Sequence, residues 1–99
     1  MTRDGHYEHR SVRVLISGRV QGVGFRYASC RAAKSLGLGG WVRNLTDGRV
    51  EMLLSGTHTQ VEKMIEWSHS GPAYAEVTDV HLQECAFEPI SDFTSRQTK

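Results

Sequence analysis

The chain has 99 residues, of which 38% are hydrophobic and 23% are charged, and its formal net charge is +1. This length suits a single domain, and the near-neutral charge argues against a broad electrostatic surface for nucleic acid or anionic membrane. No apolar run is long enough to span a bilayer, so we expect a cytoplasmic protein. Residues 1–11 are polar and are expected to form a flexible N-terminal segment, followed by one domain over residues 12–99.

The first half of that domain predicts a strand, a helix and a second strand. Residues 12–18 are rich in β-branched side chains and end at a glycine, which is typical of a strand. A helix is expected over residues 25–36, where the apolar side chains recur at helical spacing: Phe25, Ala28, Ala32 and Leu36. Glycines then end the helix, and residues 41–45 are expected to form the second strand.

The second half predicts a hairpin, another helix and further strands. Asp47-Gly48 indicates a tight turn that leads into a strand over residues 49–54. Thr57 and Gln60 fit a capping box, and Val61, Met64 and Ile65 form the apolar stripe of a second helix. A fourth strand is expected over residues 75–82, and a short closing strand is an open possibility after Pro89, around Ile90 and Phe93.

This order of elements is the split βαβ pattern of a ferredoxin-like fold. We therefore expect an α+β sandwich in which two helices cover one face of an antiparallel sheet. Enzymes, metal carriers and RNA-binding modules all use this fold, so the function has to be argued from a site.

The run from Ser17 to Arg26 combines features of an anion site. Gly22 and Gly24 can adopt positive φ and turn successive N–H groups inward. The helix that follows adds its unpaired N–H groups and the positive end of its dipole, and Arg26 adds a planar fork of donors. The alternative is an ordinary glycine-rich turn followed by a solvated arginine.

A second segment, residues 40–51, contains Asn44 just before the tight turn. We expect the first and second strands to be neighbours in the sheet, which would place the end of the first strand and the start of the first helix beside Asn44. A carboxamide both donates and accepts hydrogen bonds, so it could hold a water in line with a bound phosphoryl group.

Taken together, residues 18–26 and 40–51 resemble the two signatures of the acylphosphatase family, in the right order and at the right separation. The resemblance extends from residue 12 to about residue 93, although the aromatic C-terminal ending often found in the family is missing. It implies hydrolysis of the carboxyl-phosphate anhydride bond of acyl phosphates, without a metal or organic cofactor. It also implies that Arg26 binds the phosphate, that Asn44 positions the attacking water, and that the loop amides cradle the phosphate oxygens: Val20, Gln21, Gly22, Val23, Gly24 and Phe25.

The chemistry agrees with this reading, because phosphoryl transfer needs mainly positioning and stabilisation of charge on the equatorial oxygens. The proton acceptor is left open: Asp47 and Glu51 are the acidic residues in these segments, and the substrate's own phosphate is another candidate. We expect Trp41 and Phe25 to lie in the core. Nearby arginines are expected to be solvated or locally paired: Arg19, Arg43 and Arg49.

The expected partners are a small-molecule acyl phosphate and, as competing anions, inorganic phosphate or sulfate. We expect a monomer that binds neither nucleic acid nor membrane. No metal site is expected, because the five histidines are scattered, and whether Cys30 and Cys85 pair is left open. The alternatives are an acylphosphatase-like domain that handles phosphate or carbamoyl phosphate, and an RNA-binding ferredoxin-like module, which would need exposed aromatic residues on its central strands.

Overall fold

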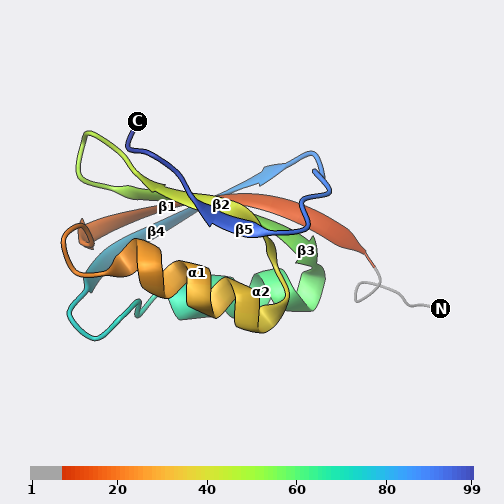
Figure 1. The fold of residues 1–99 in the computed structure, drawn as a ribbon, viewed down its shortest axis with the longest axis horizontal. Coiled ribbons are helices and arrows are strands. Elements are labelled where there is room, and N and C mark those ends of the chain that lie inside the picture. The colour runs from red at the N-terminus through yellow and green to blue at the C-terminus, as the bar shows by residue number, and fades with distance from the viewer. Residues whose placement is uncertain (1–7) are drawn as a thin grey trace.

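Two helices pack against one face of a five-stranded sheet in the computed structural model, which describes residues 8–99 (Figure 1). The predicted α+β ferredoxin-like class and the two predicted helices are confirmed. In chain order the elements are β1 (His9–Arg19), α1 (Phe25–Leu36), β2 (Gly39–Asn44), β3 (Val50–Thr57), α2 (His58–Ser68), β4 (Glu76–Cys85) and β5 (Phe93–Ser95).

The strand order is β4-β1-β3-β2-β5, and every neighbouring pair is antiparallel except β2 and β5. The sheet is therefore mixed, because one parallel pair is added to the antiparallel sheet that was predicted. After β4 the chain crosses to the opposite edge of the sheet and reverses direction, so β5 runs parallel to β2. The closing strand exists even though the chain lacks an aromatic C-terminal ending, because Phe93 is fully buried and anchors it.

Strand β1 begins earlier than expected and includes part of the N-terminal segment that was predicted to be flexible. Residues 9–11 pair with β3, and Ser11 also pairs with β4. Ser11 is fully buried, and its hydroxyl lies 2.6 Å from the hydroxyl of Ser55 and accepts the N–H of Glu88. These bonds satisfy a buried polar group inside the sheet, which explains why the strand extends this far. Residues 1–7 lie outside the described part of the chain.

The core lies between the sheet and the helices. Alternate residues of β1 point towards the helices and are fully buried: Val12, Val14 and Ile16. The predicted stripe of α2 is confirmed, because Val61, Met64 and Ile65 are all buried. Such alternation on strands and three-to-four spacing on helices is what a two-layer sandwich requires.

The stripe predicted for α1 is only partly right. Phe25 is buried, but Ala28, Ala32 and Leu36 are half-buried. The face of the helix turned fully inward instead carries Ser29 and Ala33. Ser29 is tolerated there because its hydroxyl donates to the carbonyl of Phe25, at 2.7 Å.

Strands β1 and β2 are not neighbours as predicted, because β3 lies between them. Both are antiparallel to β3, so they run in the same direction and end at the same side of the sheet. The loop after β1 and the hairpin after β2 consequently lie at one end of the molecule, on the left in Figure 1. This shared end brings the two sequence signatures together.

Candidate active site

The loop that joins β1 to α1 leads into a helix without a side-chain cap. Gly24 is the N-cap of α1 and has φ 80° and ψ 18°, and Gly22 has φ 74°. Both angles lie in the left-handed region that glycine adopts without steric cost. No side chain accepts a hydrogen bond at this N-terminus, and no acidic residue occupies the first turn. The first N–H groups of the helix are therefore available to an external anion.

A small cavity of about 200 Å³ lies at this helix N-terminus. Arg26 comes from the first turn of α1, and Asn44 is the last residue of β2. The cavity thus brings together the two predicted catalytic side chains, which belong to different elements. Its lining comprises Val20, Gly22, Gly24, Phe25, Arg26, Tyr27 and Asn44.

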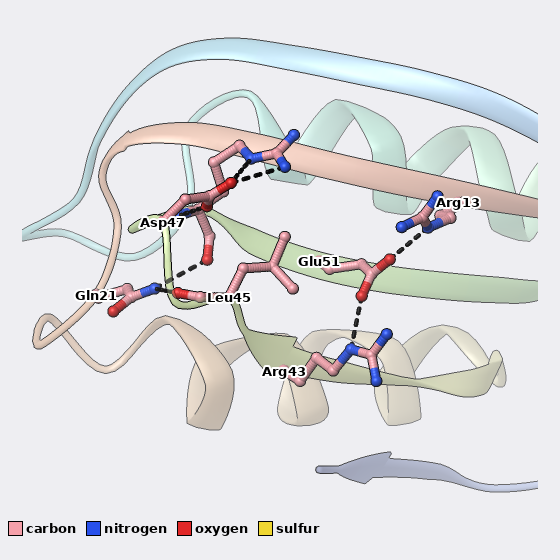
Figure 2. A network of polar contacts seen from close by, with 7 residues as sticks. Arg13, Gln21, Arg43, Leu45, Asp47 and Glu51 are labelled. Atoms are coloured by element: carbon pink, nitrogen blue, oxygen red, sulfur yellow. Dashed lines mark hydrogen bonds and ion pairs between the residues drawn. The ribbon is translucent and has the colours of Figure 1, made fainter. Parts of the chain in front are cut away.

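Two residues of the predicted cradle do not line the cavity. Val23 packs against the hydrophobic core. The Gln21 carboxamide points to the hairpin after β2, where its Nε2 donates to the carbonyls of Leu45 and Arg49 at 2.8 and 2.9 Å (Figure 2). That the backbone N–H groups of this loop cradle an anion stays a prediction.

Sequence reasoning missed Tyr27, which lines the cavity although its side chain is 69% exposed. The guanidinium of Arg31, one turn further along α1, lies over the Tyr27 ring, with its Cζ 5.9 Å from the ring centre. The only available signal was its place directly after Arg26, in the first turn of the helix.

Arg26 differs from most of the arginines around it. Within residues 8–99, no carboxylate forms an ion pair with Arg26, whereas Arg43 binds Glu51 at 2.6 Å and Arg49 binds Asp47 at 2.8 Å. The predicted local pairing of Arg43 and Arg49 is confirmed. A guanidinium that lines a cavity without an internal counter-ion is free to bind an anionic ligand.

Both carboxylates near the signatures are engaged by arginines. Glu51 is fully buried between Arg13 and Arg43 (Figure 2). Burial raises the pKa of the Glu51 carboxyl, but the hydrogen bonds from Arg43 and Arg13 outweigh burial, so its pKa lies below the usual range. The hydrogen bond from Arg49 likewise lowers the pKa of Asp47. Neither residue lines the cavity, so neither is placed as a general base there.

Trp41 is not in the core as predicted, whereas Phe25 is. Trp41 is half-buried and alternates with the fully buried Val42, which places it on the face of the sheet away from the helices. The guanidinium carbons of Arg43 and Arg96 lie 4.7 and 4.8 Å from its ring centre. Cation–π attraction of this kind explains how a tryptophan is accommodated on the open face.

The described residues contain neither a metal-binding cluster nor a disulfide. Among residues 8–99, no group of three or more His, Cys, Asp or Glu side chains is arranged to hold a metal ion. Cys30 is half-buried, Cys85 is exposed, and the two thiols are not joined. Neither described helix is long and apolar enough to cross a membrane.

Comparison with known proteins decides the family. The acylphosphatase family pattern matches residues 12–95, which is most of the chain. The chain belongs to the acylphosphatase family. It is 56% identical to an acylphosphatase of Acaryochloris marina over 82 residues, covering 83% of this chain and 85% of that protein. As an acylphosphatase, it hydrolyses acyl phosphates to a carboxylate and inorganic phosphate.

Solved structures agree with this assignment. The acylphosphatase of Coxiella burnetii superimposes with a TM-score of 0.86 at 39% identity, covering 89% of this chain and 93% of that one. A full-length HypF, solved in its phosphate- and nucleotide-bound form, matches with a TM-score of 0.84 over 92% of this chain but only 12% of its own. At 24% identity, the HypF match establishes the fold alone.

Proposed function

We propose that in this acylphosphatase the loop of residues 20–26 and the Arg26 guanidinium hold the phosphoryl group, while Asn44 positions the attacking water. The observation that carries the proposal is the cavity of about 200 Å³, which is lined by Arg26, Asn44 and two glycines. These glycines, Gly22 and Gly24, have left-handed backbone conformations. Resemblance to the family signatures points to the same two side chains.

In the proposed reaction the water oxygen attacks phosphorus, and the bond between phosphorus and the bridging oxygen breaks. The acyl carboxylate leaves with the electron pair of that bond. Negative charge on the equatorial oxygens is stabilised by Arg26 and by N–H groups at the start of α1, all fixed before the substrate arrives. No imidazole or carboxylate lines the cavity among the described residues, so we assign the water's proton to an oxygen of the transferring phosphoryl group.

The size of the cavity bears on substrate choice. At about 200 Å³ it is smaller than the usual pocket for a drug-sized molecule, roughly 300–1,000 Å³. It suits a phosphoryl group, with the acyl group at the mouth. We therefore expect acetyl phosphate and bulkier acyl phosphates all to be hydrolysed. A phosphate monoester should be a poor substrate, because its alkoxide leaving group needs a general acid and no imidazole or carboxyl group of the described residues lines the cavity.

A steady-state series tests this proposal. It compares one acyl phosphate with one phosphate monoester and adds inorganic phosphate or sulfate as inhibitors. Both anions should compete with the substrate, because they present tetrahedral oxygens to the same donors. Noncompetitive inhibition by phosphate, or efficient cleavage of the monoester, would contradict the proposed site.

The RNA-binding alternative finds little support in the fold. Strands β1 and β3 lie in the middle of the sheet and contain no Phe, Tyr or Trp. Trp41, on β2, is already contacted by two guanidinium groups. Central strands without aromatic side chains provide no platform on which bases can stack. A monomeric state and a cytoplasmic location stay predictions.

A further inference from the structure

The Gln21 side chain forms a cross-link between the two halves of the active site. It belongs to the loop that leads to Arg26, yet it turns away from the cavity. Its Nε2 atom donates one hydrogen bond to the Leu45 carbonyl, at 2.8 Å, and another to the Arg49 carbonyl, at 2.9 Å (Figure 2). A carboxamide nitrogen has two N–H donors, so this atom is fully used.

The two carbonyls mark the base of the hairpin turn between β2 and β3. The Leu45 N–H donates to the Arg49 carbonyl at 2.8 Å, and the Gly48 N–H donates to the Leu45 carbonyl at 3.1 Å. Asn44 directly precedes Leu45. Gln21 therefore fastens the loop to the hairpin one residue away from the side chain that is proposed to hold the water.

No other hydrogen bond among the described residues joins the loop to the hairpin. Across residues 8–99, no backbone hydrogen bond joins residues 20–24 to residues 44–49, and the only side-chain hydrogen bonds between them come from Gln21. The sheet does not pair the two strands either, since β3 separates β1 from β2. The sheet fixes the ends of the two strands, since Ile16 and Asn44 both pair with Val50. Between the loop itself and the hairpin, Gln21 supplies the only hydrogen bonds among the described residues.

We propose that Gln21 is a positioning residue, which keeps the phosphate loop and Asn44 at the separation required for in-line attack. This role rests on the functions proposed above for the loop and Asn44. Phosphate binding uses the loop and Arg26 alone, so it should tolerate the loss of the cross-link. The attack joins a water held by one segment to a phosphorus held by the other, so the rate of the attack should depend on the cross-link.

The test is a double-mutant cycle of Gln21→Ala and Asn44→Ala, with Gln83→Ala as the matched control. Gln83 is an exposed glutamine on β4, whose side chain accepts a single long hydrogen bond from Arg13, at 3.3 Å. The measured quantities are kcat and KM for acetyl phosphate and the inhibition constant of inorganic phosphate. Circular dichroism and urea unfolding establish that each variant is folded.

Gln21→Ala should lower kcat by about tenfold, since a misplacement of about 1 Å can cost as much as 100-fold, and should change the phosphate inhibition constant by less than about threefold. In the Asn44→Ala background the same substitution should change kcat by less than about twofold, because residues that act as one unit are not additive. Gln83→Ala should leave all three quantities unchanged. If Gln21→Ala does not fold, Gln21→Met, which keeps the length and removes the donors, takes its place.

Full additivity in the cycle, or a loss of phosphate affinity as large as the loss of kcat, would overturn the positioning role and leave the proposed function intact. An Asn44→Ala enzyme with wild-type kcat would overturn the proposed role of Asn44 and the Gln21 proposal with it. The two failures are therefore distinguishable.

Discussion

The N-termini of the two helices satisfy their backbone donors in opposite ways. Helix α2 has a complete capping box: the Thr57 side chain accepts the Gln60 N–H, and the Gln60 side chain accepts the Thr57 N–H. The N-cap of helix α1, Gly24, provides no side-chain acceptor, and a cavity lies there instead. One helix N-terminus is closed by its own chain, and the other is open to a ligand. Donors that a fold leaves unsatisfied beside a cavity are thus a marker of function.

The arginines repeat this contrast. On the open face of the sheet, Arg13 and Arg43 share the buried carboxylate of Glu51. At the cavity, Arg26 has no carboxylate partner among the described residues. Substitutions on the two sides should therefore differ in kind, with losses of activity around the cavity and losses of stability elsewhere.

The largest effect is expected from Arg26→Ala. Loss of the guanidinium should abolish phosphate binding and lower kcat/KM by roughly 1,000-fold or more, as removal of an arginine from a phosphoryl-transfer site typically does. Arg26→Lys should rescue poorly, because an ammonium is a point charge without the planar fork. The midpoint of urea unfolding should barely change. Steady-state kinetics measure the loss, and near-wild-type turnover in Arg26→Ala would refute the assignment.

Asn44→Ala should lower kcat by at least about 100-fold, comparable to the loss of one preorganised polar group from a reaction centre. The inhibition constant of inorganic phosphate should stay close to that of the wild type, because the carboxamide acts on the water. Comparing kcat with that constant separates the two roles. If the constant rises while kcat is unchanged, Asn44 is a binding residue.

Glu51→Gln should affect stability and leave kcat unchanged. Removing the charge that two arginines share should cost about 1–3 kcal/mol, the usual penalty for leaving buried hydrogen-bonding groups poorly satisfied. Because the folded-state pKa of Glu51 lies below its unfolded value of about 4.3, the unfolded state binds more protons in this range. The stabilisation is therefore present above about pH 4.3 and is lost as the pH falls through the folded-state pKa.

Urea unfolding between pH 3 and pH 7 measures this contribution. Subtracting the Glu51→Gln curve from the wild-type curve should give a difference that grows as the pH rises. A difference that does not depend on pH would show that the buried carboxylate is not held in its charged form.

The smallest effect is expected at the closed helix N-terminus. Thr57→Ala should lower the free energy of unfolding by about 1 kcal/mol, the typical value of an N-cap side chain. Turnover should not change, since Thr57 is the N-cap of α2 and lies outside the cavity. Thermal unfolding and one kinetic assay measure these effects. A Thr57→Ala enzyme with impaired kcat would contradict the claim that, of the two helix N-termini, only that of α1 takes part in the reaction.

Local features of the molecule were predictable from the sequence. The loop glycines, Arg26 and the capping box of α2 depend on backbone conformation over a few residues, and glycine or Thr-x-x-Gln patterns report such conformations directly. The helix from Phe25 to Leu36 was predictable for the same reason.

The directions of side chains and the order of strands were not predictable in this way. Gln21 and Trp41 are placed by contacts with segments distant in sequence, the hairpin turn for one and Arg96 for the other. The position of β3 between β1 and β2 and the parallel pairing of β5 are likewise long-range choices. Apart from a tight turn such as that at Asp47-Gly48, which specifies a hairpin, local pattern carries no information on which of several similar strands will pair.

The central claim is that the open N-terminus of α1 binds the phosphoryl group, and titrating isotope-labelled protein with inorganic phosphate tests it directly by NMR. The account predicts saturable shifts of the backbone amides of residues 22–27, with no comparable shifts at residues 58–60 of the capped helix α2. The dissociation constant of phosphate should equal its kinetic inhibition constant, and Arg26→Ala should show neither phosphate binding nor inhibition by phosphate. Shifts centred on α2 or at the opposite end of the sheet would contradict the account.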